Sequence, residues 1–254
     1  MANVQEIFEA LAAWAPLELQ LDFDNSGFLV GRKEKPVHRA LLALDITDEV
    51  IREAMEIGAD LILSHHPLIF HPLKSLTGEG PGRKALLLAE SGIAAICMHT
   101  NLDIAEGGVN DVLLRLLGAE PEGPVDAVGC GRVGTLPEPM VLQDFLALCK
   151  ERLHAKGLRY VDGGRPVHRL GVLGGAGGDE FHDALEKGCD TYVTADVKYH
   201  VFLEAAEEGV NLIDADHFCT ENPVILVLAE RLRKAFPSIE FTVSVKHRQV
   251  ISFY

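Results

Sequence analysis

The stretch LILSHHPLIFHP, Leu61–Pro72, decides the fold class and the chemistry expected of this chain. Its apolar start, Leu61–Leu63, has the composition of a short strand buried on both faces, as in parallel sheets. The run stops at two adjacent histidines, His65 and His66, followed by Pro67. Successive residues of a strand point to opposite faces, so both rings reach one ligand only where the strand ends, as Pro67 predicts. Paired imidazoles there indicate a metal site, although a histidine more often has a structural or surface role.

The preceding residues predict a βαβ unit. Arg39–Leu44 has the composition of a second buried strand. Thr47 follows as a helix N-cap, with Asp48 and Glu49 in the positive first turn of the helix. Gly58 then ends the helix before the next strand. A strand, a helix and a strand in this order favour a parallel sheet, so we expect an α/β fold.

A third strand, Ile93–Met98, also ends in polar residues. His99 follows it directly, and the segment TNLD places Asp103 four residues later. In open α/β sheets, binding sites lie outside the carboxyl ends of the strands. We therefore expect His99 and Asp103 beside the histidine pair, with Asp103 as the preferred carboxylate.

The second half of the chain repeats this pattern at an offset of 130 residues. Three identities recur in equivalent places: Arg39, Gly58 and Asp60 against Arg169, Gly188 and Asp190. We therefore expect two similar α/β halves, each with a mainly parallel sheet flanked by helices and with a metal site in the cleft between them. The connector Gly118–Pro124 places the boundary near residue 125, so that the halves are 1–125 and 126–254.

The second half ends its third strand, Val210–Ile213, with the segment DADHFCTEN. His217 and Glu221 are four residues apart in this segment, and Glu221 is expected at the entry of the helix that starts near Pro223. A histidine on a loop and a carboxylate at a helix start can then chelate one cation. Cys219 lies between them as a soft ligand or, in the favoured interpretation, as a buried free thiol.

Two loops have alternative interpretations. Asp24 and Asn25, in DFDNSGFLVG, are turn formers that either make a structural turn or border the site. The stretch Gly174–Gly178 follows a strand, and such a loop can let the backbone approach a phosphate, yet it lacks the lysine and the spacing of nucleotide-binding loops.

The composition is typical of a soluble globular protein, with 48% hydrophobic and 24% charged residues among 254. The formal charge of −15, from 38 acidic and 23 basic residues, would repel phosphate backbones, so no nucleic-acid partner is expected. No export signal and no apolar run near the roughly 20 residues of a membrane helix are found, so no membrane partner is expected. Five scattered cysteines without a C-x-x-C pair favour reduced thiols and a cytoplasmic location.

A known family carries the same set of motifs. This chain resembles the dinuclear-metal family of GTP cyclohydrolase 1 type 2 homologues, also called Nif-three-like proteins, in HHP (65–67), TNLD (100–103), H-x-x-x-E (217–221), DNSGFLVG and GGAGG. The resemblance implies a homohexamer with two divalent metal ions per chain. The ligands that it implies are His65, His66, Asp103, His217 and Glu221. Family members often have glycine in place of Asp216, a difference that concerns substrate contacts.

Three imidazoles and two carboxylates suit borderline metals such as Zn, Fe, Mn, Co or Ni. Water that bridges two such ions about 3.5–4 Å apart has a lowered pKa and can attack a substrate. We therefore predict a metal-dependent hydrolase with a small-molecule substrate, which the family name implies to be a nucleotide such as GTP. His99 is the candidate for proton transfer, because it is not needed as a ligand. The alternative is a metal-binding oligomer that handles metal or regulates without turnover.

Overall fold

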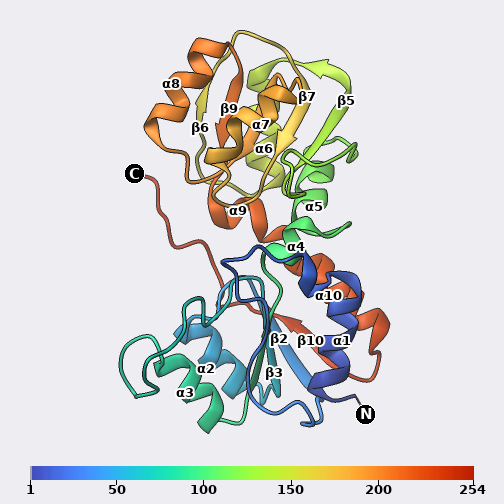
Figure 1. The fold of residues 1–254 in the computed structure, drawn as a ribbon, viewed down its shortest axis with the longest axis vertical. Coiled ribbons are helices and arrows are strands. Elements are labelled where there is room, and N and C mark those ends of the chain that lie inside the picture. Colours follow the sequence, from blue (N-terminus) through green and yellow to red (C-terminus); the bar gives the residue numbers. More distant parts are fainter. Residues whose placement is uncertain (1) are drawn as a thin grey trace. The chain divides into compact units, whose positions relative to one another are not determined.

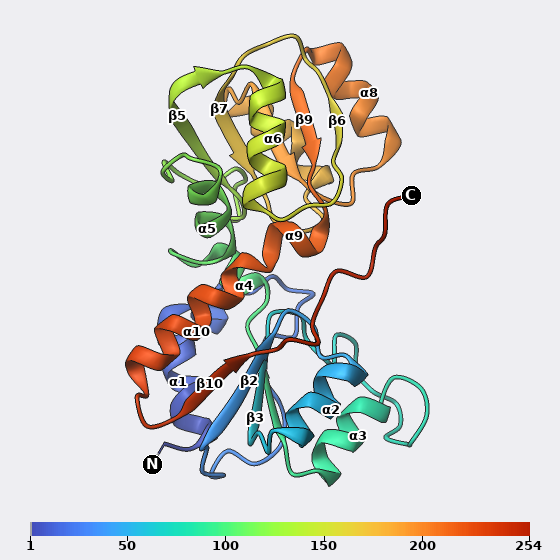
Figure 2. The same ribbon diagram turned by 180° about the vertical axis from the view of Figure 1, so that it is seen from behind.

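The structure, a computed structural model, describes residues 2–254 and contains two compact units (Figures 1 and 2). The first unit comprises the residues up to Glu106 together with Ile225–Arg248. The second unit comprises Gly107–Val224 and Gln249–Tyr254. This division differs from the expected boundary near residue 125, because Leu113, Leu114 and Leu117 already belong to the apolar core of the second unit. The last strand of the chain, in turn, pairs with the sheet of the first unit.

A five-stranded sheet forms the centre of the first unit, in the order β1-β4-β3-β2-β10. Strands β4, β3, β2 and β10 are parallel, and β1 is antiparallel at one edge. The strands are β1 (Gly27–Val30), β2 (Arg39–Ala43), β3 (Leu61–Ser64), β4 (Ala94–Cys97) and β10 (Glu240–Val243). The helices are α1 (Val4–Trp14), η1 (Leu17–Leu19), α2 (Asp48–Glu56), α3 (Arg83–Glu90), α4 (Thr100–Ile104) and most of α10 (Pro223–Ala235). The predicted parallel α/β architecture is confirmed here.

The βαβ unit of β2, α2 and β3 forms for the reasons that its sequence indicates. Thr47 caps α2, since its Oγ1 accepts a hydrogen bond of 3.2 Å from the amide of Val50. Val50 and Ile51 are buried in one cluster with Leu41 of the sheet. Gly58, at φ +67°, lets the chain leave the helix in the left-handed conformation that other residues adopt at a cost.

The second unit also has a five-stranded sheet, in the order β5-β7-β8-β9-β6. Its three central strands are parallel, and both edge strands are antiparallel. The strands are β5 (Arg132–Met140), β6 (Arg159–Val161), β7 (Val167–Val172), β8 (Thr191–Thr194) and β9 (Asn211–Asp214). The helices are α5 (Val109–Leu116), α6 (Leu142–Arg152), η2 (Gly178–Glu180), α7 (Phe181–Glu186), α8 (Tyr199–Glu208) and α9 (His217–Glu221).

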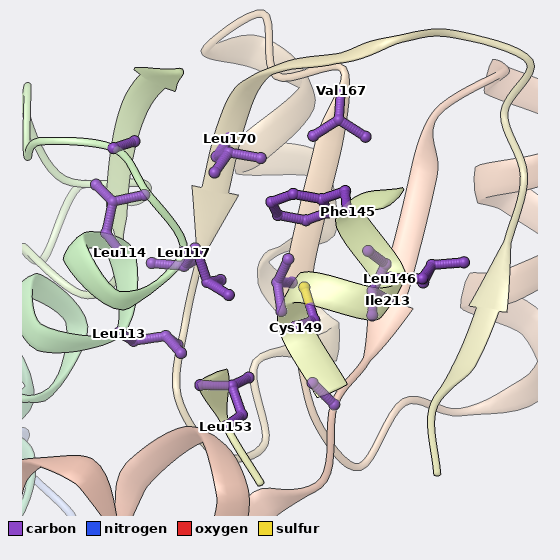
Figure 3. Close-up of a cluster of buried hydrophobic side chains, with 14 of the residues drawn as sticks. Leu113, Leu114, Leu117, Phe145, Leu146, Cys149, Leu153, Val167, Leu170 and Ile213 are labelled. Atoms are coloured by element: carbon purple, nitrogen blue, oxygen red, sulfur yellow. The ribbon is translucent and has the colours of Figure 1, made fainter. Parts of the chain in front are cut away.

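Both faces of this second sheet are covered by apolar side chains. On one face, Phe145 of α6 lies in a buried cluster with Leu113, Leu170 and Ile213 (Figure 3). Tyr192, next to Val193 in β8, belongs to a separate buried cluster, as expected when neighbouring strand residues point to opposite faces. Within residues 2–254, no helix has both the length and the apolar character needed to cross a bilayer.

Equivalent hydrogen bonds occur in the two units at the offset of 130 residues. In each unit, an aspartate just before a parallel strand (β3 or β8) accepts hydrogen bonds from two backbone amides near the start of the neighbouring parallel strand (β2 or β7). Asp60 accepts from His38 (2.8 Å) and Arg39 (3.4 Å), and Asp190 accepts from His168 (3.0 Å) and Arg169 (2.7 Å). The recurring aspartates therefore have the same structural role.

Two segments differ from the expected secondary structure. His217, expected on a loop, begins the short helix α9. The terminal run Gln249–Tyr254 has a strand-like composition that predicts a strand, but within residues 2–254 it has no strand partner and its apolar side chains are exposed. Apolar, β-branched composition alone does not make a strand, because the backbone also needs a neighbouring strand to bond.

Candidate metal centre

The four parallel strands of the first unit have their carboxyl ends on the same side of the sheet, and an imidazole or carboxylate follows each of them. His65 and His66 follow β3, and His99 comes two residues after β4. Asp45 follows β2, and His247 follows β10 at the outer edge of the sheet. The carboxyl ends of the strands thus collect groups that can bind metal, as in other open α/β sheets.

Three of these imidazoles form one cluster. The ring centroids of His65 and His66 are 5.0 Å apart, and that of His99 lies 5.2 Å from His65 and 5.6 Å from His66. One nitrogen of each ring lies within 4.8 Å of the corresponding nitrogens of the other two. The predicted proximity of His99 to the histidine pair is therefore confirmed.

His65 is buried and held in a defined orientation. Its Nδ1 lies 2.8 Å from the carbonyl oxygen of Met98, which can only accept, so Nδ1 carries the proton and donates. In the neutral ring, Nε2 then has the lone pair that a metal requires. Asp103 of α4 places Oδ1 3.6 Å from this Nε2. The predicted carboxylate is thus beside the predicted imidazole.

His66 is oriented by a carboxylate. Its Nδ1 donates to Asp45 Oδ1 over 2.7 Å, an arrangement that leaves Nε2 for a ligand. Burial alone would raise the pKa of Asp45, but hydrogen bonds from His247 and His66 outweigh it and hold the pKa well below its usual range. Asp45 is therefore ionised whenever His66 is available as a neutral ligand.

His99 has the same kind of support from Asp24. Its Nδ1 donates to Asp24 Oδ1 over 2.7 Å. Asp24 also accepts from the Thr100 amide (3.1 Å), the Thr100 hydroxyl (2.5 Å) and the Ser26 hydroxyl (2.8 Å). Burial would raise the pKa of Asp24, yet the bonds from His99, Thr100 and Ser26 keep it well below the usual range. These contacts favour the interpretation in which Asp24 borders the site. The side chain of Asn25 instead donates to the carbonyl of Ile69.

Replacing Asp24 by Asn is expected to lower the free energy of unfolding at pH 7 by about 3 kcal/mol, because an amide cannot receive all these donors with one oxygen. The pKa of Asp24 is lowered in the folded state, so its contribution is present above the unfolded value of about 3.9 and is lost as the pH falls. Urea unfolding in EDTA should therefore show a difference between the variants that shrinks from pH 7 to pH 3. Asp22→Asn, at an exposed position, is the control. A difference that is equal at both pH values would contradict this role of the Asp24 charge.

The second unit brings together the other two predicted ligands. His217 and Glu221 lie at the two ends of α9, and His217 Nε2 is 3.1 Å from Glu221 Oε2. His217 was expected on a loop and Glu221 at the entry of the long helix that follows. Both instead belong to one helical turn, which places residues four apart on the same face.

Two carboxylates surround the imidazole of His217. Its Nδ1 lies 2.7 Å from Asp196 Oδ2, on the side opposite Glu221. Burial would lower the pKa of His217, but Glu221 and then Asp196 outweigh burial and raise it to about 9. Asp196 (φ +52°) and the N-cap of α9, Asp216 (φ +74°), adopt a backbone conformation that is costly without glycine and that concentrates at functional sites. Asp216, the residue at which this chain departs from the family pattern, thus caps α9.

The glycine-rich loop Gly174–Gly178 makes room for Glu221. A Cβ on Gly175 would overlap Glu221 Oε1 and lie 3.2 Å from His217 Nε2. The amides of Gly174, Gly175 and Gly177 already donate to Asn110 Oδ1, Thr220 Oγ1 and Thr194 Oγ1. These contacts favour a structural role for the loop over the phosphate contact that its composition also suggested.

Cys219, between the two ligands of α9, is buried. Burial raises the pKa of this thiol to about 12, so it is protonated at neutral pH and a poor metal ligand. The structure therefore agrees with the interpretation of Cys219 as a buried free thiol.

The fold and the site together define an α/β protein with two mixed sheets, parallel at their centres, and with histidine and carboxylate donors suited to divalent metal. Comparison with known proteins gives the family. The model of the Duf34/NIF3 (NGG1p interacting factor 3) family matches residues 2–251, so the chain belongs to this family.

Curated relatives and solved structures agree with this assignment. A Clostridium perfringens protein named GTP cyclohydrolase 1 type 2 homolog is 37% identical over 260 aligned positions, covering 99% of each chain. The crystal structure of a Bacillus cereus protein related to NIF3 matches with a TM-score of 0.90 at 26% identity, over 100% of this chain and 99% of that one. Reduced HcgD from Methanocaldococcus jannaschii matches with a TM-score of 0.84 at 32% identity, over 95% of this chain and 97% of that one.

Sequence reasoning missed two of the groups that orient the ligands. From the sequence, Asp45 only ends a strand and His247 only links two strand-like runs, whereas Asp196 is either a group that supports the site or part of a solvated helix start. A carboxylate shortly after the carboxyl end of a parallel strand is a usable signal, as Asp45 shows after β2. His247 gives no such signal because its partners are about 200 residues away in sequence.

Proposed function

We propose that this chain is a dinuclear metal-dependent hydrolase. The observation that supports this most directly is the orientation of the imidazoles. Nδ1 of His65, His66 and His217 is held by a carbonyl or a carboxylate, so that Nε2 can serve as the ligand atom. With Asp103 and Glu221 as carboxylates, these side chains are the donor set for two divalent ions of the Zn, Fe, Mn, Co or Ni type.

The chemistry divides between the ions and the surrounding residues. When bound, such ions lower the pKa of water and supply a hydrolytic nucleophile at neutral pH. His99 is assigned to proton transfer, because Asp24 orients its ring and one of its ring nitrogens lies within 4.8 Å of a nitrogen of His65 and of His66. Asp24 and Asp45 hold their imidazoles in place during the reaction. Each donor set is proposed to bind divalent metal, and the family resemblance implies two ions per chain.

The proposed substrate is a nucleotide, with GTP as the first candidate because relatives bear the name GTP cyclohydrolase 1 type 2 homolog. Two exposed aromatic rings beside the histidine cluster support a planar substrate. Phe23 and Phe70 are 63% and 38% exposed, and their ring centroids are 6.3 Å apart. Phe70 lies edge-on to His99, with centroids 6.1 Å apart and planes at 84°. Exposed aromatic faces of this kind stack on bases.

Replacing Phe23 by Leu is expected to weaken GTP binding, because the apolar bulk is kept while the aromatic face is lost. Base stacking on one ring contributes roughly 1–3 kcal/mol, so the dissociation constant should rise about 5- to 150-fold. Calorimetric titration with GTP measures this, and metal content should stay unchanged. The control is Leu76→Ala, which removes an exposed apolar side chain elsewhere in the same unit. Equal GTP affinity in Phe23→Leu and wild type would refute the stacking role.

The proposed activity is tested by removing and restoring the metal. Protein stripped with a chelator, and the same protein reloaded with Zn²⁺, Mn²⁺, Fe²⁺, Co²⁺ or Ni²⁺, is incubated with GTP and a panel of nucleotides. We expect turnover of at least one substrate only after reloading. If reloaded protein holds about two ions per chain and converts nothing in the panel, the alternative of a non-catalytic metal-handling or regulatory protein replaces the hydrolase.

Three further properties are proposed alongside this function. The chain is expected to form a homohexamer, which light scattering on the eluting protein would test as six times the chain mass of 27.6 kDa. The matched hydrogen bonds of Asp60 and Asp190 support an origin of the two units by internal duplication. All five cysteines are buried thiols outside any disulfide, which supports a reducing, cytoplasmic setting.

A further inference from the structure

We propose that His247 is a positioning residue for the metal ligand His66, acting through Asp45, so that the C-terminal segment is part of the metal centre. This inference rests on the proposed function, because it requires His66 to bind metal. His247 belongs to none of the motifs that identify the family resemblance.

The ring of His247 has a defined orientation. Its Nδ1 lies 3.4 Å from the Leu44 amide, which can only donate, so Nδ1 is unprotonated and Nε2 carries the proton. Nε2 lies 3.4 Å from Asp45 Oδ2, while the other oxygen of Asp45 accepts from His66 Nδ1 over 2.7 Å. One carboxylate therefore joins two imidazoles, and each imidazole occupies a different oxygen.

This arrangement restricts how Asp45 can turn. The carboxylate is 45% exposed, so one hydrogen bond from His66 would leave it free to rotate or to exchange its partner for water. The side chain of His247 is only 5% exposed and closes the side away from His66. With both oxygens bound, the plane of the carboxylate and hence the direction of His66 Nε2 are set before metal arrives.

The segment that carries His247 is anchored without help from its ring. Ser244 extends the pairing of β10 with β2, since its amide donates to the Leu42 carbonyl over 2.8 Å. Glu53 of α2, itself buried, accepts from the Ser244 hydroxyl, the Val245 amide (2.9 Å) and the Lys246 amide (3.3 Å). A role limited to fastening the chain end would therefore not require the imidazole.

A metal-affinity cycle on the full chain tests the inference. His247→Leu keeps the volume and removes the donor, and Asp45→Asn removes the carboxylate that links the two rings. We expect His247→Leu to weaken Zn²⁺ binding about 10- to 100-fold in chelator competition, the range usual for residues that orient a ligand. His247→Gln, which retains a terminal N–H, should recover part of the affinity. In the Asp45→Asn background, His247→Leu should have almost no further effect.

A spectroscopic readout and a neighbouring control complete the design. In the Co²⁺-loaded protein, His247→Leu should change the visible absorption bands, because the direction of a ligand changes. Arg248→Ala, with a side chain 74% exposed in the same segment, should leave both affinity and bands as in wild type. Thermal unfolding in EDTA confirms that each variant folds.

Two results would overturn the inference. One is unchanged Zn²⁺ affinity and an unchanged Co²⁺ spectrum in His247→Leu. The other is an equal loss of affinity with and without the Asp45 carboxylate, which would show that His247 acts by another route. A wild-type chain that binds no Zn²⁺ would instead refute the proposed metal centre itself, so the two failures are distinguishable.

Discussion

Replacing Gly175 by Ala should remove most of the metal that depends on His217 and Glu221. The new Cβ would overlap Glu221 Oε1 and would lie 3.1 Å from its Cδ, inside ordinary contact distance. The hydrogen bond of 3.0 Å from the Gly175 amide to Thr220 Oγ1 holds α9 against the loop, so the side chain of Glu221 would have to turn its carboxylate away from its present position. Elemental analysis after dialysis should therefore show about one ion per chain in place of the proposed two.

The matched control for this variant is Gly188→Ala. Gly188 has φ +74° and Gly175 has φ +71°, so alanine pays the same backbone cost of about 1–2 kcal/mol at either position. No atom of the described residues lies within 4 Å of a Cβ at Gly188, however, and no proposed ligand is displaced. Urea unfolding should show comparable losses of stability, while metal content falls only in Gly175→Ala. Equal metal content in the two variants would contradict the idea that the loop shapes the site.

Replacing His65 by Ala should have the largest effect on metal binding in the first unit. His65 is fully buried, and the hydrogen bond from its Nδ1 to the Met98 carbonyl leaves Nε2 as the ligand atom, which alanine lacks. We expect Zn²⁺ affinity to fall by more than about 100-fold, which exceeds the usual cost of losing a group that only orients a ligand. Chelator competition measures the affinity, and any metal-dependent turnover should fall in parallel.

The control for His65→Ala is His182→Ala on α7. His182 has a side chain 67% exposed and pairs with Glu204 at the surface. Its loss should leave metal content and affinity as in wild type. Glu221→Gln provides a second comparison from the other unit, and it should also lower metal content. If His65→Ala retains both ions, the assignment of the strand-end histidines as ligands is wrong.

Most of the framework could be predicted from local sequence. The apolar runs at Arg39–Leu44 and Ile93–Met98 were long enough, and bounded sharply enough by polar residues, to indicate buried parallel strands. The helix cap at Thr47 could also be predicted, because its hydroxyl can accept a hydrogen bond from an amide in the first turn of α2. The expected terminal strand at Gln249–Tyr254 was wrong, because strand formation depends on a partner that local sequence does not reveal.

The candidate ligands could be named from the sequence, but the groups that orient them could not. His65, His66 and His99 follow buried strands, and the geometry of parallel sheets then brings them to one edge. Asp45 and His247 become partners only because β10, near the end of the chain, pairs in register with β2. Likewise, glycine is needed at position 175, after β7, only because the carboxylate of Glu221, in α9 after β9, lies against it.

The sequence by itself determined the α/β class, the parallel strands and the identity of the metal-type side chains, because hydrophobic periodicity and ligand chemistry are local properties. Only the tertiary structure decided which carboxylate holds which imidazole, which nitrogen is left for metal, and where a Cβ has no room. These are contacts of a few ångströms between residues far apart in the chain. Their geometry is set by strand pairing and packing, and neither can be read from the residues that make the contact.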